Sequence, residues 1–176
     1  SAGAAVTTGV NNTLIGGLAG DAITTGDNNV VLGMSALTAN TTGAQNVAIG
    51  SAALEVSTTA SDNTAVGFKS LNKNTTGTRN NAFGALSLDA TTTGGYNSAF
   101  GYNSLGANTT GEENVAIGDN AGADNTTGDK NTAVGTSSLS SNTTANKNTA
   151  MGYAALNANT TGFENTAIGS LALDAN

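Results

Sequence analysis

The chain contains neither histidine nor cysteine in its 176 residues. Histidine is the commonest general acid and base in enzymes, and cysteine is one of their strongest nucleophiles, so two common routes to catalysis are missing. The twelve carboxylates form no unbroken row along the chain, and the pair Glu112 and Glu113 is typical of a solvated turn. We therefore expect no enzyme activity, no cofactor and no metal site.

Positive charge and long apolar segments are also scarce. Five Lys and Arg residues stand against twelve Asp and Glu residues, which gives a net charge of -7. Without a basic stripe for phosphate groups, nucleic acid is a poor partner. No stretch approaches the roughly 18 apolar residues of a membrane span, so membrane insertion is not expected. An acidic, cysteine-free chain rich in Thr and Asn favours a location outside the cell, on a virion or on a cell surface.

What the sequence does contain is a strict period of seventeen residues. Glycine recurs at this spacing from Gly16 to Gly169 without a slip. An asparagine precedes each of these glycines by four residues: Asn12, Asn29, Asn46, Asn63, Asn80, Asn97, Asn114, Asn131, Asn148 and Asn165. Pairs of adjacent threonines follow the same period from Thr7 onward, and their first members include Thr24, Thr41, Thr58, Thr75, Thr92, Thr109, Thr126, Thr143 and Thr160. Such regularity indicates stacked, nearly identical coils and argues against low-complexity disorder.

The length of the period selects the secondary structure. Helical repeats need about 33 residues or more, whereas seventeen residues suit one coil of a β-solenoid. The abundance of Thr, Val, Ile, Asn and Gly agrees with strands and turns. The sequence therefore predicts an all-β fold: a β-solenoid (a parallel β-helix or β-roll) of about ten coils, forming one domain over residues 1–176. Coils stacked at about 4.8 Å would make a rod on the order of 48 Å long.

Most coils carry two bulky apolar positions, and two coils have Gly20 or Gly122 at the second of them. One is the residue before the periodic glycine, such as Ile49, and the other is a leucine such as Leu54. Strand alternation places the Asn, Ala and Gly of the Asn-x-Ala-x-Gly segment on one face and the bulky residue on the other. Because one coil buries little apolar area, we expect the chain to associate with itself, as a trimer or by lateral pairing. The repeat also continues into both terminal coils, so we expect either a part of a longer rod or a subunit whose open ends join head to tail.

The repeated asparagines and threonines have a structural interpretation. Stacked amides bond to the amides of neighbouring coils, and threonines stack as β-branched rows. We therefore predict that the asparagines and threonines given above form structural ladders.

Two surface functions are weighed beside this interpretation. Asn-Thr-Thr sequons make glycosylation a candidate modification at Asn40, Asn74, Asn108, Asn125, Asn142 and Asn159. Ice binding is the other, since β-solenoids can present rows of threonine. Adjacent threonines on a strand point to opposite faces, so only a single outward row is expected, which disfavours this function.

The unit N-T-A-V-G-F-K-S-L-N-K-N-T-T-G-T-R, residues 63–79, resembles the seventeen-residue repeats of phage tail-fibre shafts and bacterial surface fibres. Its organisation is also similar to that of the repeats in the heads of trimeric autotransporter adhesins and in surface proteins of large algal viruses. The resemblance covers essentially the whole chain. It implies a trimeric or filamentous β-solenoid displayed outside the cell, with no particular residue assigned a binding role.

These observations lead to one expected function and two alternatives. The expected function is a structural subunit of an extracellular fibre or filament, with further copies of the chain as its partner. The first alternative is an adhesin or receptor-binding rod of a phage tail fibre or cell surface, for which surface glycans are candidate partners. The second alternative is an ice-binding solenoid.

Overall fold

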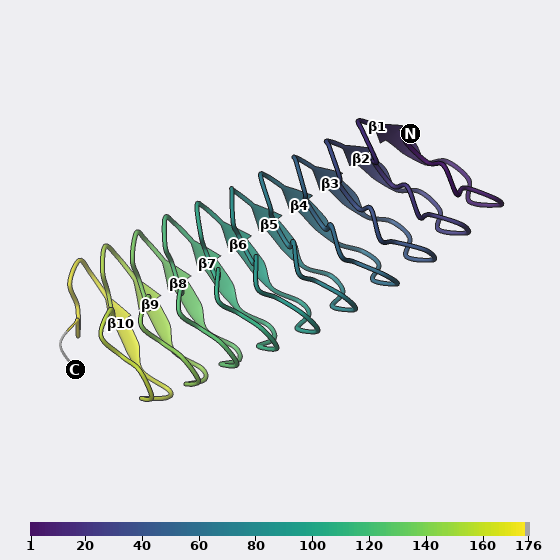
Figure 1. Ribbon diagram of the computed structural model, residues 1–176. Coiled ribbons are helices and arrows are strands. Elements are labelled where there is room, and N and C mark those ends of the chain that lie inside the picture. The colour runs from purple at the N-terminus through teal and green to yellow at the C-terminus, as the bar shows by residue number, and fades with distance from the viewer. Residues whose placement is uncertain (175–176) are drawn as a thin grey trace.

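The computed structural model describes residues 1–174, which form a rod of coils stacked one after another, with the N-terminus at one end and the last coil at the other (Figure 1). Every regular element is a strand of three residues. The strands are β1 (Thr13–Ile15), β2 (Val30–Leu32), β3 (Val47–Ile49), β4 (Thr64–Val66), β5 (Asn81–Phe83), β6 (Ser98–Phe100), β7 (Val115–Ile117), β8 (Thr132–Val134), β9 (Thr149–Met151) and β10 (Thr166–Ile168).

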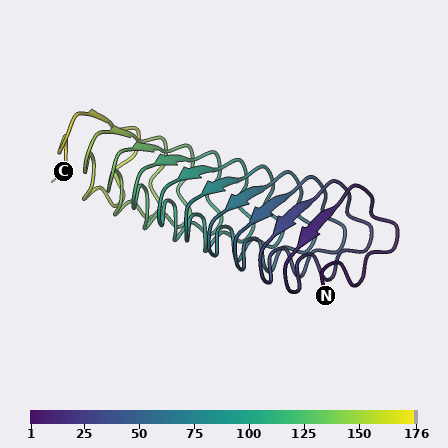
Figure 2. The same cartoon turned by 90° about the horizontal axis from the view of Figure 1, so that it is seen from above.

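The ten strands form a single parallel sheet in the order of the sequence. Each strand pairs with the next at a shift of seventeen residues, so that Ala48 lies beside Ala65 and Ala65 beside Ala82. The strands consequently lie in one line along the rod (Figure 2). The predicted all-β solenoid with a seventeen-residue coil is confirmed.

A common numbering makes the coils comparable. Each coil is counted here from its periodic asparagine, position 1, to position 17, so that the coil of Asn46 ends at Asp62. Positions 2 to 4 are the strand, and position 3, usually Ala, is buried in nine of the ten strands. Positions 2 and 4 flank it on the opposite side of the sheet. The interior thus receives one residue from each strand, Leu14 and Val31 from the first two and Ala from the other eight.

The leucines at position 9 fill most of the remaining interior. Leu37, Leu54, Leu71 and Leu88 are fully buried, and they form one apolar cluster with the alanines. Gly20 stands at position 9 of the first full coil, and a side chain there would overlap Leu14 and Ile23. These two larger residues occupy positions that Ala and Asn hold in most other coils. The first coil therefore keeps the interior filled by moving its apolar volume to other positions.

Many residues at the turns of each coil have positive φ, the left-handed backbone region, which the sequence did not predict. Twenty-eight residues other than glycine have positive φ, and they fall at positions 7, 9 and 17. The leucines at position 9 have φ between 50° and 53°, a region that favours glycine because it crowds the Cβ atom. Bonds between coils hold this conformation; for example, the Leu37 N–H donates to the Ala53 carbonyl at 2.9 Å. At position 5, φ lies between 128° and 148°, and a Cβ would in most coils overlap the backbone of the next coil, which explains the unbroken glycine row.

Candidate functional surface

The rod offers no enclosed site in the part of the chain that is described. Residues 1–174 contain no pocket and no group of His, Cys, Asp or Glu residues that could hold a metal ion. No helix long and apolar enough to cross a bilayer occurs among them. The repeated features of the described residues are rows of side chains that run along the rod, inside it and on its faces.

The periodic asparagines at position 1 form a continuous ladder inside the rod. The Oδ1 atom of each accepts a hydrogen bond from the backbone N–H of the asparagine in the next coil, at 2.9–3.1 Å over nine successive steps. The Nδ2 group donates to the carbonyl at position 15 of its own coil, as Asn46 does to Ala60 at 2.9 Å. Each amide thus ties its own coil and the neighbouring coils together, which gives this row a structural role.

A second polar row occupies position 12, which is the asparagine of the Asn-Thr-Thr sequons. Asn40, Asn74, Asn108, Asn125, Asn142 and Asn159 are all buried, with exposed fractions between 0% and 3%. The Nδ2 group of Asn125 donates to the Gly128 carbonyl at 3.0 Å and to Asn108 Oδ1 at 3.0 Å. A glycan is attached through this same nitrogen. The candidate glycosylation sites are therefore interior in this fold, and the interpretation of these sequons as modification sites is corrected to one of coil packing.

The strand residues at positions 2 and 4 form what we name the outer sheet face. Its position 4 row consists of Ile, Leu, Val, Phe and Met, and most of these side chains are exposed, Ile117 for example by 44%. Position 2 carries Thr, Val, Asn or Ser, so neither row contains a charged residue in any of the ten strands. The rings of Phe83 and Phe100 stack in parallel with centroids 4.9 Å apart. The outer sheet face is thus uncharged and largely apolar along the whole rod.

Further exposed apolar side chains follow the strands by two residues, at position 6. Met34, Phe68, Tyr102 and Tyr153 each expose more than half of their area. Smaller or polar residues such as Ser51, Ala85 and Asp119 stand between them. This row therefore varies strongly in size and polarity from one coil to the next.

The threonine pairs at positions 13 and 14 form what we name the threonine face. The pairs lie in bends and not in strands, and the second threonine of every pair is exposed in all ten coils. The Oγ1 of the first threonine donates to the carbonyl of the first threonine in the next coil, at 2.9–3.3 Å over nine steps. The first threonines are half-buried or exposed and also point away from the core. The expectation of a single outward row was therefore wrong, because it applied strand alternation to a bend.

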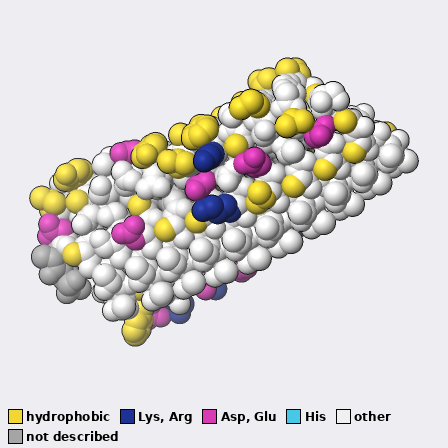
Figure 3. Space-filling model, viewed as in Figure 1, with side chains coloured by type: hydrophobic (Ala, Val, Ile, Leu, Met, Phe, Trp, Pro, Cys, Tyr) yellow, Lys and Arg dark blue, Asp and Glu magenta, His cyan; other side chains and the backbone are white. Residues whose placement is uncertain are grey.

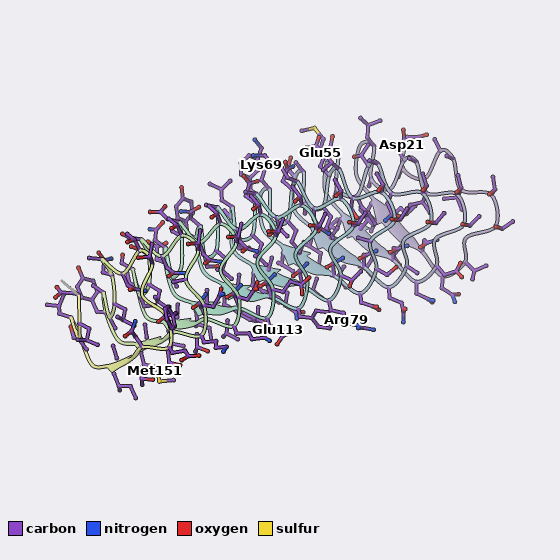
Figure 4. The ribbon with its side chains drawn as sticks, turned by 90° about the horizontal axis from the view of Figure 1, so that it is seen from below. Asp21, Glu55, Lys69, Arg79, Glu113 and Met151 are labelled. Carbon is purple, nitrogen blue, oxygen red and sulfur yellow. The ribbon has the colours of Figure 1, made fainter. Side chains whose placement is uncertain are left out.

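Charged side chains lie at the edges of the rod. Asp21, Glu55 and Lys69 lie along one long edge, whereas Arg79 and Glu113 lie along the other, on the same side as the uncharged Met151 of the outer sheet face (Figure 4). Lys147 and Glu164 form an exposed ion pair at 3.0 Å. Figure 3 shows charged groups in small separate clusters, with white side chains and backbone over most of the visible face. No broad field of one sign covers that view of the surface.

The carboxyl group of Asp89 has a shifted acidity. It lies at position 10, and burial raises its pKa above the ordinary value, while nearby Lys73 and Lys69 partly oppose this shift. Its Oδ1 atom is buried without a hydrogen-bond partner. In two other coils position 10 holds an amide donor: Asn72 and Asn157 each donate from Nδ2 to the carbonyl at position 7 of the preceding coil at 2.9 Å.

Comparisons with protein-family models, with curated proteins and with solved structures found no match for this chain.

Proposed function

We propose that the protein is a structural rod of an extracellular fibre, and that copies of the chain associate through the outer sheet face. One observation carries the proposal: an uncharged, largely apolar face runs along all ten strands of a densely hydrogen-bonded rod. Continuous exposed apolar surface of this kind marks interaction sites in soluble proteins. A role based on shape and contact also agrees with the lack of a pocket in residues 1–174.

A second copy of the chain is the partner that suits this face. The net charge of -7 opposes association wherever charged edges meet, but the outer sheet face carries no Lys, Arg, Asp or Glu. Its residues repeat at the strand spacing of about 4.8 Å, so another parallel copy has the same spacing and can pack along its whole length. A partner without this period would meet only a few of the rows.

The area of the outer sheet face determines how many coils a stable interface needs. Ten strands at about 4.8 Å and three residues at about 3.3 Å cover a footprint of roughly 480 Å². A standard interface takes about 800 Å² of accessible surface from each partner. Exposed residues beside the strands, such as Met34 and Tyr102, would add to the contact. The contact area grows with each added coil. Association through the outer sheet face is therefore stronger for rods of many coils, as a fibre requires.

Sedimentation velocity of the purified chain over a range of concentrations tests the proposal. The diagnostic variant combines Phe83→Ser, Phe100→Ser and Ile117→Ser, which remove apolar area from the centre of the face without adding charge. The matched control combines Val10→Ser, Val56→Ser and Phe163→Ser, three exposed apolar residues outside the strands. We expect oligomers for the natural chain and the control, and monomers for the diagnostic variant. A natural chain that stays monomeric at the highest concentration would refute the proposal, as would unchanged oligomers of the diagnostic variant.

A further inference from the structure

The second threonine of each pair repeats without a structural reason inside the rod. Thr8, Thr25, Thr42, Thr59, Thr76, Thr93, Thr110, Thr127, Thr144 and Thr161 are all exposed. None of their hydroxyl groups takes part in a hydrogen bond within the described residues, in contrast to those of the first threonines. Packing and internal bonding therefore do not account for the identity of this residue.

Other exposed positions of the same coils show how freely such residues vary. Position 17 changes from Gln45 to Asp62 to Arg79 in three successive coils, and position 6 from Met34 to Ser51 to Phe68. The coil therefore accepts charged, aromatic and small residues where a side chain points into solvent. Only position 14 combines full exposure with the same residue in all ten coils. This contrast within one chain indicates that the hydroxyl and methyl of position 14 serve something outside the rod.

The backbone beneath the threonine face is fixed by bonds between coils. The carbonyl of Thr92 accepts three hydrogen bonds, from Thr75 N at 2.9 Å, from Thr76 N at 3.2 Å and from Thr75 Oγ1 at 2.9 Å. The carbonyls of Thr41 and Thr126 are bonded in the same way from the preceding coil. Because the first hydroxyl is always engaged with the same acceptor, its side chain has a uniform orientation along the rod. The side chains of the first row, and the backbone that carries the second row, are thereby held at the coil spacing of about 4.8 Å.

The chemistry of the threonine face narrows the class of ligand. Neither row contains a charged or aromatic residue, so it lacks the groups that bind phosphates, acidic or basic peptides, or stacked sugar rings. The face has no pocket, and a discrete small molecule would therefore be poorly enclosed. A ligand that suits it must itself be extended, uncharged and periodic on the scale of a few ångströms, and must accept both methyl and hydroxyl contacts. The surface of an ice crystal has these properties.

We propose that the threonine face binds ice. The rigid rows hold water in a regular arrangement over methyl groups, while the free hydroxyls of position 14 join the hydrogen-bond network of that water. Bound chains cover the crystal surface and slow its growth. This activity is independent of association through the outer sheet face, which lies in a different part of each coil.

Growth of single ice crystals in the presence of the purified chain tests this proposal. The readouts are the gap between melting and growth temperatures, inhibition of recrystallisation, and accumulation of fluorescently labelled protein on growing ice. The diagnostic variant combines Thr76→Lys, Thr93→Lys and Thr110→Lys at the centre of the second row. The matched control combines Ser51→Lys, Ala85→Lys and Thr136→Lys at position 6, which adds the same charge to another part of the rod. Thermal melting of all three proteins verifies that the substitutions, two of which replace the half-buried Ser51 and Ala85, leave the fold intact.

The outcomes are distinct. We expect the natural chain and the control to arrest growth and to accumulate on ice, and the diagnostic variant to lose both properties. A natural chain that neither arrests growth nor accumulates on ice would overturn the proposal. Full activity of the diagnostic variant would overturn it as well, because ice binding would then reside elsewhere on the rod.

Discussion

The two halves of the rod use the same interior position in different ways. In the C-terminal half, position 12 is asparagine in four successive coils, from Asn108 to Asn159, and each amide bonds to the next at 2.8–3.4 Å. In the N-terminal half the row is interrupted by Ile23, Ser57 and Thr91. There, both polar atoms of Asn40, the Oγ of Ser57, the Oδ1 of Asn74 and the Oγ1 of Thr91 are buried without a partner.

This difference shows that a ladder residue cannot be judged alone. The Nδ2 of an asparagine at position 12 can donate within its own coil, as Asn74 does to the Gly77 carbonyl at 2.9 Å, but its Oδ1 lacks a partner where the next coil presents Thr91 and no amide. A buried polar group without a partner costs about 1–3 kcal/mol. Asparagine at position 12 therefore stabilises the C-terminal half of the rod, whereas in the N-terminal half it leaves buried polar atoms unpaired.

Breaking the complete row should have the largest effect. Asn125→Val removes the bonds to Asn108 Oδ1 and to the Gly128 carbonyl and takes away the acceptor used by Asn142 Nδ2 at 2.8 Å. Position 12 is threonine at Thr91, in a coil that also holds a leucine at position 9. Valine has the shape of threonine, so the coil of Asn125 has room for it. We expect the free energy of unfolding to fall by about 2 kcal/mol, since Asn108 Oδ1 is left without a partner while the Gly128 carbonyl and Asn142 Nδ2 each keep one of their two bonds. Urea denaturation followed by circular dichroism measures the change, and a loss below about 1 kcal/mol would contradict a cooperative ladder.

The same substitution in the interrupted row should act in the opposite direction. Asn40 lies between Ile23 and Ser57, and neither of its side-chain polar atoms has a partner. We expect Asn40→Val to raise the free energy of unfolding by about 1 kcal/mol, because two unpaired buried groups are replaced by apolar atoms. Asn125→Val and Asn40→Val, measured in one denaturation series, serve as controls for each other. Destabilisation of both to a similar degree would show that the shape of the side chain at position 12, and not its hydrogen bonds, determines stability.

The architecture follows from the sequence more fully than the orientation of individual side chains does. The period of seventeen, the interior leucines and the asparagine row at position 1 were all accessible from spacing alone. Strand alternation, however, describes only three residues of each coil. Leu37 adopts positive φ, Asn74 points inward from a sequon, and Thr76 and its neighbour both point outward, because the rest of the coil is bends whose directions depend on bonds between coils. The threonine face could have been found by asking which exposed position never varies.

Repairing the interrupted row should stabilise the N-terminal half. Thr91→Asn places an amide between Asn74 and Asn108, where its Nδ2 can donate to the unpaired Asn74 Oδ1 and its Oδ1 can accept from Asn108. We expect a gain of about 1 kcal/mol for the bonds formed. Hydrogen exchange resolved by coil is the sharper measurement, because slower exchange should be concentrated in the coils next to residue 91. Thr92→Asn, at the half-buried position that follows, is a control that should give no such protection. If exchange near residue 91 were unchanged or faster, the missing amide would not be what distinguishes the two halves.

Asp89→Asn should give the smallest effect, and one that depends on pH. Burial raises the pKa of Asp89 in the folded chain, so the folded state binds the proton more tightly than the unfolded state, and the natural chain loses stability as pH rises through this carboxyl's titration. Asparagine removes the charge and can donate to the Lys69 carbonyl, as Asn72 and Asn157 donate at the same position. We expect the variant to be more stable by about 1 kcal/mol at pH 7, with the advantage shrinking as pH falls toward about 4, where the natural carboxyl becomes a donor itself, and levelling off below that pH. Thermal melts of both proteins from pH 3 to pH 8 give this difference, and subtracting one series from the other cancels the titration of the remaining carboxylates. An advantage that grew toward low pH would mean that Lys69 and Lys73, and not burial, dominate the energetics of this carboxyl.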